Sequence, residues 1–93
     1  MPDDVPSDVH AVLTQLFKEA ESAILSEEYE TTRQTVDTAE TVCRNKLPEG
    51  ELRAQLLHGC DRVQAALDSA DGVDSDTTAE YLRAMDRRLA RTE

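Results

Sequence analysis

The spacing of apolar residues constrains the fold of this chain more than any other feature of the sequence. In four segments an apolar side chain recurs every three or four residues, the period of an amphipathic α-helix, and no segment alternates in the manner of a strand. The predicted helices cover about residues 8–25, 28–46, 48–68 and 76–91. Helices of this length joined by short connections pack with antiparallel neighbours. The sequence therefore predicts a single all-α domain over residues 1–93, either an antiparallel bundle or two stacked helical hairpins.

The predicted inward faces indicate a core of modest size. The chain has one Phe, two Tyr and no Trp, so burial has to come from Leu, Val and Ala, and the alanines draw helices close together. The residues expected to face inward are Val9, Leu13, Leu16, Phe17, Ala20, Ala23, Ile24, Tyr29, Thr32, Val36, Ala39, Cys43, Leu47, Leu52, Leu56, Gly59, Cys60, Val63, Ala66, Leu67, Thr78, Tyr81, Leu82, Met85 and Leu89.

Three local signals predict where helices begin. Ser7, directly after a proline, is the expected N-cap of the first helix. Pro48 suits the first turn of the third helix, where its missing N–H costs nothing. Before the fourth helix the residues 74–76 are candidate caps, and Thr77 followed three residues later by Glu80 has the spacing of a capping box.

The charge balance limits the partners of this chain. It has 20 acidic and 10 basic residues, a formal charge of −10, which repels nucleic acid and anionic membranes unless the basic groups gather on one face. Lys18 and Lys46 are the only lysines, Ile24 is the only isoleucine, and Thr, Ala and Asp are abundant. This composition resembles that of proteins from halophilic archaea, which keep molar salt inside the cell. The resemblance implies an acidic surface adapted to solvent, and the alternative is an acidic surface made for a basic partner.

The chain has no sequence signal for a membrane or for export. No run of about 18 apolar residues is present to span a bilayer. The first ten residues, MPDDVPSDVH, lack the basic and apolar regions of a signal peptide. We therefore expect a soluble cytoplasmic protein with no membrane partner, in which the two cysteines are reduced thiols.

One stretch resembles part of a known helical repeat. In SEEYETTRQTVDTAETV, Tyr29, Val36 and Ala39 follow a tight turn, and the pattern is similar to the second half of a tetratricopeptide repeat. The glycine usual before that turn is absent, and Thr32 stands where the family prefers alanine. The resemblance covers about a third of the chain; it implies a helical hairpin and carries over no binding residues.

Two alignments within the chain indicate an internal repeat. TQLFKEAES (14–22) aligns with AQLLHGCDR (54–62) at an offset of 40, and TTRQTVDTA (31–39) aligns with TTAEYLRAM (77–85) at an offset of 46. The longer second linker can absorb the change of offset. The identities are few enough to arise by chance among helical sequences, so duplication and coincidence both stay open.

The stretch LLHGC raises the question of a metal or thiol site. Residues two apart on a helix point about 200° from each other, so His58 and Cys60 cannot close on one ion. Neither a CxxC nor an i, i+4 ligand pair is present. If the turn centres near Pro48, Cys43 lies about 9 Å from Cys60 along the helix axis, too far for a disulfide. We expect two small buried thiols and a surface histidine, with no metal and no cofactor.

A basic stripe on the last helix is the main candidate binding feature. Arg83, Arg87 and Arg91 recur every four residues opposite the apolar face, with Arg88 beside the edge of the core. Such a stripe could hold a phosphate group or an acidic partner helix. Cations near a helix C-terminus are also favoured by the helix dipole, and they pair with acidic residues one turn away. The stripe is therefore a candidate contact for an anion or a partner, with a structural alternative.

Three apolar residues outside the predicted stripes are a candidate interface. These are Val12, at the margin of the first helix, and Leu25 and Leu57, outside the main faces of theirs. If they converge on one patch, they mark a surface for a protein partner or for a second copy of the chain.

No pattern in the sequence indicates catalysis. The carboxylates lie in polar runs where solvent keeps them ionised, no glycine-rich phosphate loop occurs, and no nucleophile stands beside a base at a recognisable spacing. We expect no catalytic residues and no enzyme activity. The predicted function is a non-catalytic protein-binding or assembly module of a halophilic cytoplasm. The alternative is a helical accessory subunit of a nucleic-acid or regulatory complex that uses the arginine stripe, although the charge argues against nucleic acid.

Overall fold

The computed structural model describes residues 5–69 and 72–91, and this part of the chain folds into four α-helices with no strand. The helices are α1 (Ser7–Leu25), α2 (Tyr29–Lys46), α3 (Glu51–Leu67) and α4 (Ser75–Ala90). The predicted all-α class is confirmed. Each helix begins and ends within three residues of its predicted boundary.

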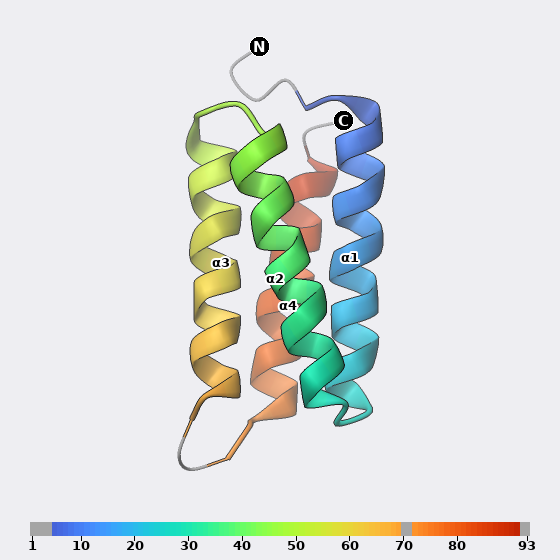
Figure 1. Cartoon of the computed structure of the whole chain (residues 1–93), viewed down its shortest axis with the longest axis vertical. Coiled ribbons are helices and arrows are strands. Elements are labelled where there is room, and N and C mark those ends of the chain that lie inside the picture. Colours follow the sequence, from blue (N-terminus) through green and yellow to red (C-terminus); the bar gives the residue numbers. More distant parts are fainter. Residues whose placement is uncertain (1–4, 70–71, 92–93) are drawn as a thin grey trace.

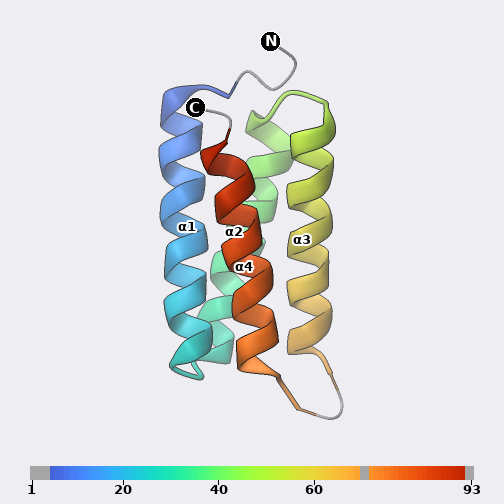
Figure 2. The same cartoon turned by 180° about the vertical axis from the view of Figure 1, so that it is seen from behind.

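The helices form an antiparallel up-and-down bundle (Figure 1). Contacts join α1 to α2 and α4, and join α3 to the same two helices. The view from behind shows the same arrangement, in which α1 begins and α4 ends at the same end of the bundle (Figure 2). Because α1 and α3 make no mutual contact, they lie on one diagonal of the bundle, which measures 42 × 19 × 19 Å.

The core follows the predicted stripes with a few differences. Leu16, Gly59, Ala66 and Tyr81 are half-buried rather than buried, and Tyr29 is 37% exposed. All other residues predicted to face inward are buried. One further alanine, at position 79 of α4, is also buried. The stripes were therefore right in register, and the differences lie at their margins, where neighbouring helices cover a side chain only in part.

The buried positions also show how the two helical hairpins correspond. Adding 43 to each of Val9, Leu13, Phe17, Ala20 and Ile24 gives the buried residues of α3. The sequence alignment at an offset of 40 is thus three residues out of structural register. By contrast, adding 46 to the buried residues of α2 gives buried residues of α4, as the second sequence alignment has it.

Two buried threonines illustrate this correspondence between α2 and α4. Thr32 donates its hydroxyl to the Glu28 carbonyl at 2.9 Å, and Thr78 donates to the Asp74 carbonyl at 2.8 Å. Each hydroxyl is therefore satisfied within its own helix, one turn back. Burial of a polar group in the core costs little under these conditions.

Three details of the helix starts differ from their predictions, whereas Asp74, one of the candidate caps of the fourth helix, is the observed N-cap. Ser7 is the first helical residue of α1 and Pro6 takes the cap position, without a side-chain bond. Pro48 lies in the α2–α3 connection, since α3 begins three residues later. The predicted capping box does not form, because Thr77 lies inside α4 and donates its backbone N–H to the Asp74 carboxylate at 3.1 Å. An aspartate already satisfies the amide that the box would have used.

Candidate functional site

The structure does not bring the three arginines of the predicted stripe together as a free cationic face. Arg83 Nε donates to Glu21 Oε2 of α1 at 2.6 Å, and its Nη1 donates to Glu80 Oε1 at 2.5 Å. These two hydrogen bonds raise the pKa of Arg83. Arg87 and Arg91 are exposed, and within residues 5–69 and 72–91 neither forms an ion pair. The first arginine of the stripe therefore joins α4 to α1.

The three apolar residues of the predicted interface lie on separate surfaces. Val12 and Leu25 are 47% and 46% exposed, but they are thirteen positions apart along α1, which turns one about 140° from the other around the helix. Leu57 is half-buried against the core on α3, the helix diagonal to α1. No common patch forms from these residues.

Both thiols are buried in the core. Burial raises the pKa of Cys43 to about 11, with Glu40 adding to the effect. Burial likewise raises the pKa of Cys60 to about 12, with Cys43 as the next cause. The cysteines are not joined in a disulfide, and their separation along the helix axes stays a prediction. His58 is exposed on α3, as predicted.

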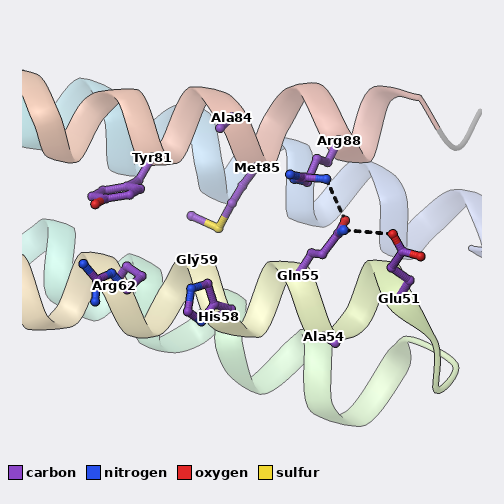
Figure 3. A pocket seen from close by; sticks show the side chains of 10 residues that line it. All are labelled: Glu51, Ala54, Gln55, His58, Gly59, Arg62, Tyr81, Ala84, Met85 and Arg88. Atoms are coloured by element: carbon purple, nitrogen blue, oxygen red, sulfur yellow. Dashed lines mark hydrogen bonds between the residues drawn. The ribbon is translucent and has the colours of Figure 1, made fainter.

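A groove lies between α3 and α4 and is lined by both apolar and charged side chains. Its volume is about 570 Å³, within the range of about 300–1,000 Å³ typical of binding pockets. Figure 3 shows side chains from both helices along it. The lining residues are Glu51, Ala54, Gln55, His58, Gly59, Arg62, Tyr81, Ala84, Met85 and Arg88.

The floor of the groove depends on a glycine. A Cβ atom at position 59 would lie 2.4 Å from Met85 Sδ and 2.7 Å from its Cγ. The absence of a side chain at Gly59 therefore lets the Met85 thioether lie against the backbone of α3. Ala54 and Ala84 add only methyl groups to the walls. Small residues on both helices thus leave a channel over a methionine.

Hydrogen bonds define one end of the groove. Arg88 Nη1 donates to Gln55 Oε1 at 2.8 Å, and Gln55 Nε2 donates to Glu51 Oε1 at 3.0 Å (Figure 3). This chain of three side chains crosses from α4 to α3. The Gln55 amide orients both charged groups, so Arg88 is held in place at the edge of the groove.

The other end of the groove combines a cation with an aromatic ring. Arg62 of α3 and Tyr81 of α4 lie across from each other there (Figure 3). Within the described residues, Arg62 has no hydrogen-bond or ion-pair partner. Arg62 at this end and Arg88 at the opposite end give the groove a basic rim in a chain of net charge −10, and Glu51 is the one acidic residue that lines it.

Comparison with known proteins places the whole chain in one family. Residues 1–91 match the family described as a domain of unknown function (DUF8101). The chain belongs to this family. No curated protein and no solved structure matches it.

The described residues contain neither a membrane-spanning helix nor a cluster of metal ligands. None of the helices described is long and apolar enough to span a membrane. In the same residues, no group of three or more His, Cys, Asp or Glu side chains is placed to hold a metal ion.

The groove was not predicted from the sequence, although its residues carried a signal. The sequence places Gly59 on the inward face of its helix and His58 on the polar face. Both residues line the groove, but neither placement predicts a concave surface between two helices. A glycine in the middle of a long helix costs about 1 kcal/mol relative to alanine, so it indicates a close approach by another group. The sequence could not show that this group is Met85, because that depends on the packing of α3 against α4.

Proposed function

We propose that this chain is a non-catalytic protein-binding module and that the α3–α4 groove is its binding surface. The observation that carries the proposal is the contrast between the groove, with its apolar floor and basic rim, and the strongly acidic chain around it. Binding surfaces are distinguished by such concave apolar patches with a few placed polar groups.

The absence of a catalytic role is part of the proposal. The groove holds an exposed histidine and a glutamate bonded to an amide, but no nucleophile beside a base. The two thiols lie in the core with raised pKa values, which keeps them protonated near neutral pH. Their burial supports a packing role.

The setting we propose is a halophilic cytoplasm. The scarcity of lysine and the excess of carboxylates support it. In molar salt the Debye length falls to about 3 Å, so the repulsion among these carboxylates is screened and the acidic surface serves solvation.

The alternative of a nucleic-acid or regulatory accessory has weaker support. It requires the arginine stripe as one face, whereas Arg83 is paired with Glu21 and Glu80. Arg87 and Arg91 alone would have to supply the contact. A protein partner in the groove needs no such rearrangement.

The test is affinity capture with matched variants, in lysate of a halophilic source kept in molar KCl. Ala84→Trp places a large ring in the groove, and Ala90→Trp places the same ring on an exposed position of α4 outside it. We expect a captured protein to be lost from the first variant and retained by the second. Loss from both or from neither would show that the groove is not the binding surface. A partner lost only from Arg87→Gln, Arg91→Gln would favour the accessory alternative.

A further inference from the structure

We infer that the occupant of the α3–α4 groove is an acidic amphipathic helix of a partner protein. This inference rests on the proposed function, and it adds the shape and charge of the partner segment. It follows from the direction of the groove, the character of its floor and the sign of its rim.

The groove runs along two helices, which suits an elongated occupant. On α3 its lining residues extend from Glu51 to Arg62, and on α4 from Tyr81 to Arg88. At about 1.5 Å per residue the α3 side is about 16 Å long, equal to three turns of helix. Within each helix the lining positions recur at three and four residues, so each wall is a continuous ridge. A third helix laid between two such ridges packs its own ridge into the space between them.

The floor favours a packed helix face over a single polar ligand. Met85 is flexible and polarisable, so it can adapt to leucine or methionine side chains from a partner. Ala54 and Ala84 add only methyl groups to the walls beside this floor, which lets another backbone approach closely. Apolar residues at i, i+3, i+4 and i+7 of a partner helix are the usual anchors in such grooves.

The rim selects the charge of the partner helix. Arg62 and Arg88 lie at opposite ends, with His58 between them, whereas Glu51 is bonded to Gln55. Carboxylates flanking the apolar face of a partner helix would meet Arg62 and Arg88, and lysines in the same places would be repelled. Arg62 has no partner within residues 5–69 and 72–91, so it is available for such a pair.

A second copy of this chain fits the groove less well. A two-fold dimer that placed groove against groove would bring Arg62 and Arg88 near the same cations of the other copy. A copy docking through a different surface would form a head-to-tail contact, which gives a ring or an open filament rather than a closed two-fold dimer. The basic rim therefore points to a partner with a separate acidic helix.

The experiment compares two synthetic peptides of about 14 residues with the same leucine positions, one flanked by glutamates and the other by lysines. Each is titrated into ¹⁵N-labelled protein, at the lowest salt concentration at which circular dichroism shows full helix content. We expect the acidic peptide to shift the amide signals of Ala54, Gly59, Ala84 and Met85, and to bind at least about tenfold more tightly than the basic peptide, a difference of about 1.4 kcal/mol.

Charge reversal supplies the matched control. Arg62→Glu changes the rim, and Arg87→Glu makes the same change in net charge at an exposed position outside the groove. We expect the preference for the acidic peptide to disappear in the first variant and to persist in the second. An equal loss in both variants would mean that net charge, and not the rim, selects the peptide, which would overturn the inference.

Other outcomes separate this inference from the proposed function. Equal binding of both peptides in the groove would overturn the acidic-helix inference and leave the groove as a binding surface. Binding of neither peptide would also overturn it, while the capture experiment with Ala84→Trp decides on the proposed function independently. Shifts of the groove signals with protein concentration alone would identify a second copy as the occupant and refute a partner helix.

Discussion

The hairpin of α1 and α2 and the hairpin of α3 and α4 share one pattern of buried positions but differ in how tightly their helices pack. Offsets of 43 and 46 relate the core residues of the first hairpin to those of the second. Nevertheless, α1 packs against α2 more extensively than α3 packs against α4. The groove lies in this less extensive contact.

The difference follows from which helix carries the large side chain. Leu16 of α1 occupies the position equivalent to Gly59 of α3, and Ala39 of α2 occupies the position equivalent to Met85 of α4. The first hairpin thus has leucine on one helix and alanine on the other, whereas the second has glycine and methionine. The periodic pattern determines the bundle, and single residues at the margin of that pattern determine its surface.

The largest effect is expected from truncating the core of the first hairpin. Phe17 is 1% exposed and is the only phenylalanine of the chain. Phe17→Ala should lower the free energy of unfolding by about 3–5 kcal/mol, through lost burial and a residual cavity. Met85→Ala should lower the free energy of unfolding by about 2 kcal/mol, at the low end of the range for methionine-to-alanine changes in a core. The effect is small because Met85 borders a groove that is already open.

Urea unfolding followed by circular dichroism measures both variants. Salt sufficient to keep each variant folded at zero urea allows the comparison even for a marginal domain. If the two substitutions proved equally costly, the contrast in packing between the hairpins would be refuted.

A second prediction transfers the first hairpin's residues to the second. Gly59→Leu alone should destabilise the chain by about 1–3 kcal/mol, because Met85 already fills the space at that position. Adding Met85→Ala reproduces the Leu16 and Ala39 arrangement and should recover much of this loss. A double-mutant cycle in urea gives the coupling, expected at about 0.5–3 kcal/mol for residues in contact.

The same double variant tests the site. With leucine at position 59 the floor of the groove is raised, so the acidic peptide should no longer bind although the bundle stays folded. Unchanged peptide affinity would show that binding does not use the floor, and additive stability effects would show that Gly59 and Met85 are not coupled.

The fold could be predicted from the sequence because it depends on periodicity. An apolar residue every three or four positions defines a helix face whatever the residue is. Phe17, Val36, Cys60 and Leu82 were all assigned to the core on this basis, and all are buried. Helix starts were less predictable, since Ser7 and Asp74 compete with neighbouring residues for the same cap position.

The groove could not be predicted because it depends on pairs of residues from different helices. Gly59 and Met85 are distant in sequence, and their contact follows from the rotation of α3 relative to α4. The arginine stripe shows the same limit. The spacing of its arginines on α4 follows from the sequence, but the ion pair between Arg83 and Glu21 of α1 depends on how the helices pack in the bundle.

The third prediction concerns the cysteines, which stand where the other hairpin has larger residues. Cys60 corresponds to Phe17, and Cys43 corresponds to Leu89. Because burial raises the pKa of these thiols to about 12 and about 11 from an ordinary value of 9.0, both stay protonated in the folded chain. A thiol-disulfide reagent should react with them at the rate of unfolding. Rapid reaction of either thiol in the native protein would contradict their burial.

The raised pKa values also fix the direction of a pH effect. Above the ordinary pKa the unfolded thiols ionise while the folded ones do not, so the unfolded state is favoured. The stabilisation that comes from keeping these thiols neutral is fully present below pH 9.0, the ordinary pKa of a thiol. It is lost as pH rises through the pKa values of the folded chain, about 11 for Cys43 and about 12 for Cys60. Urea midpoints should therefore fall above pH 9.0, and they should fall less steeply in Cys43→Ala, Cys60→Ala. If the urea midpoints of the wild type and of this variant fell equally with pH, groups other than the thiols would be responsible for the loss of stability.

The smallest expected effect on stability comes from the residue that caps the second helix of each hairpin. Asp74 caps α4, because its carboxylate accepts the backbone N–H of Thr77 and also the Thr77 hydroxyl. These two hydrogen bonds lower the pKa of Asp74. Glu28 holds the equivalent position before α2 without a side-chain cap bond. The backbone is similar at both residues, with φ −87° and ψ 96° at Asp74 and φ −91° and ψ 74° at Glu28. The longer glutamate therefore leaves the amide of Thr31, the counterpart of Thr77, without this bond.

Glu28→Asp should supply the missing cap and raise stability by about 0.5–1 kcal/mol, whereas Asp74→Glu should lower it. The pH dependence has a defined sign, since a carboxylate with a lowered pKa stabilises the fold above its unfolded pKa and loses that effect as pH falls through the folded value. Glu28→Asp should therefore add stability at neutral pH that disappears in acid. Thermal unfolding at both pH values measures this, with Glu30→Asp in the first turn of α2 as the control. An equal gain in the control would show that shortening an acidic side chain near this helix start, and not a cap at position 28, is responsible.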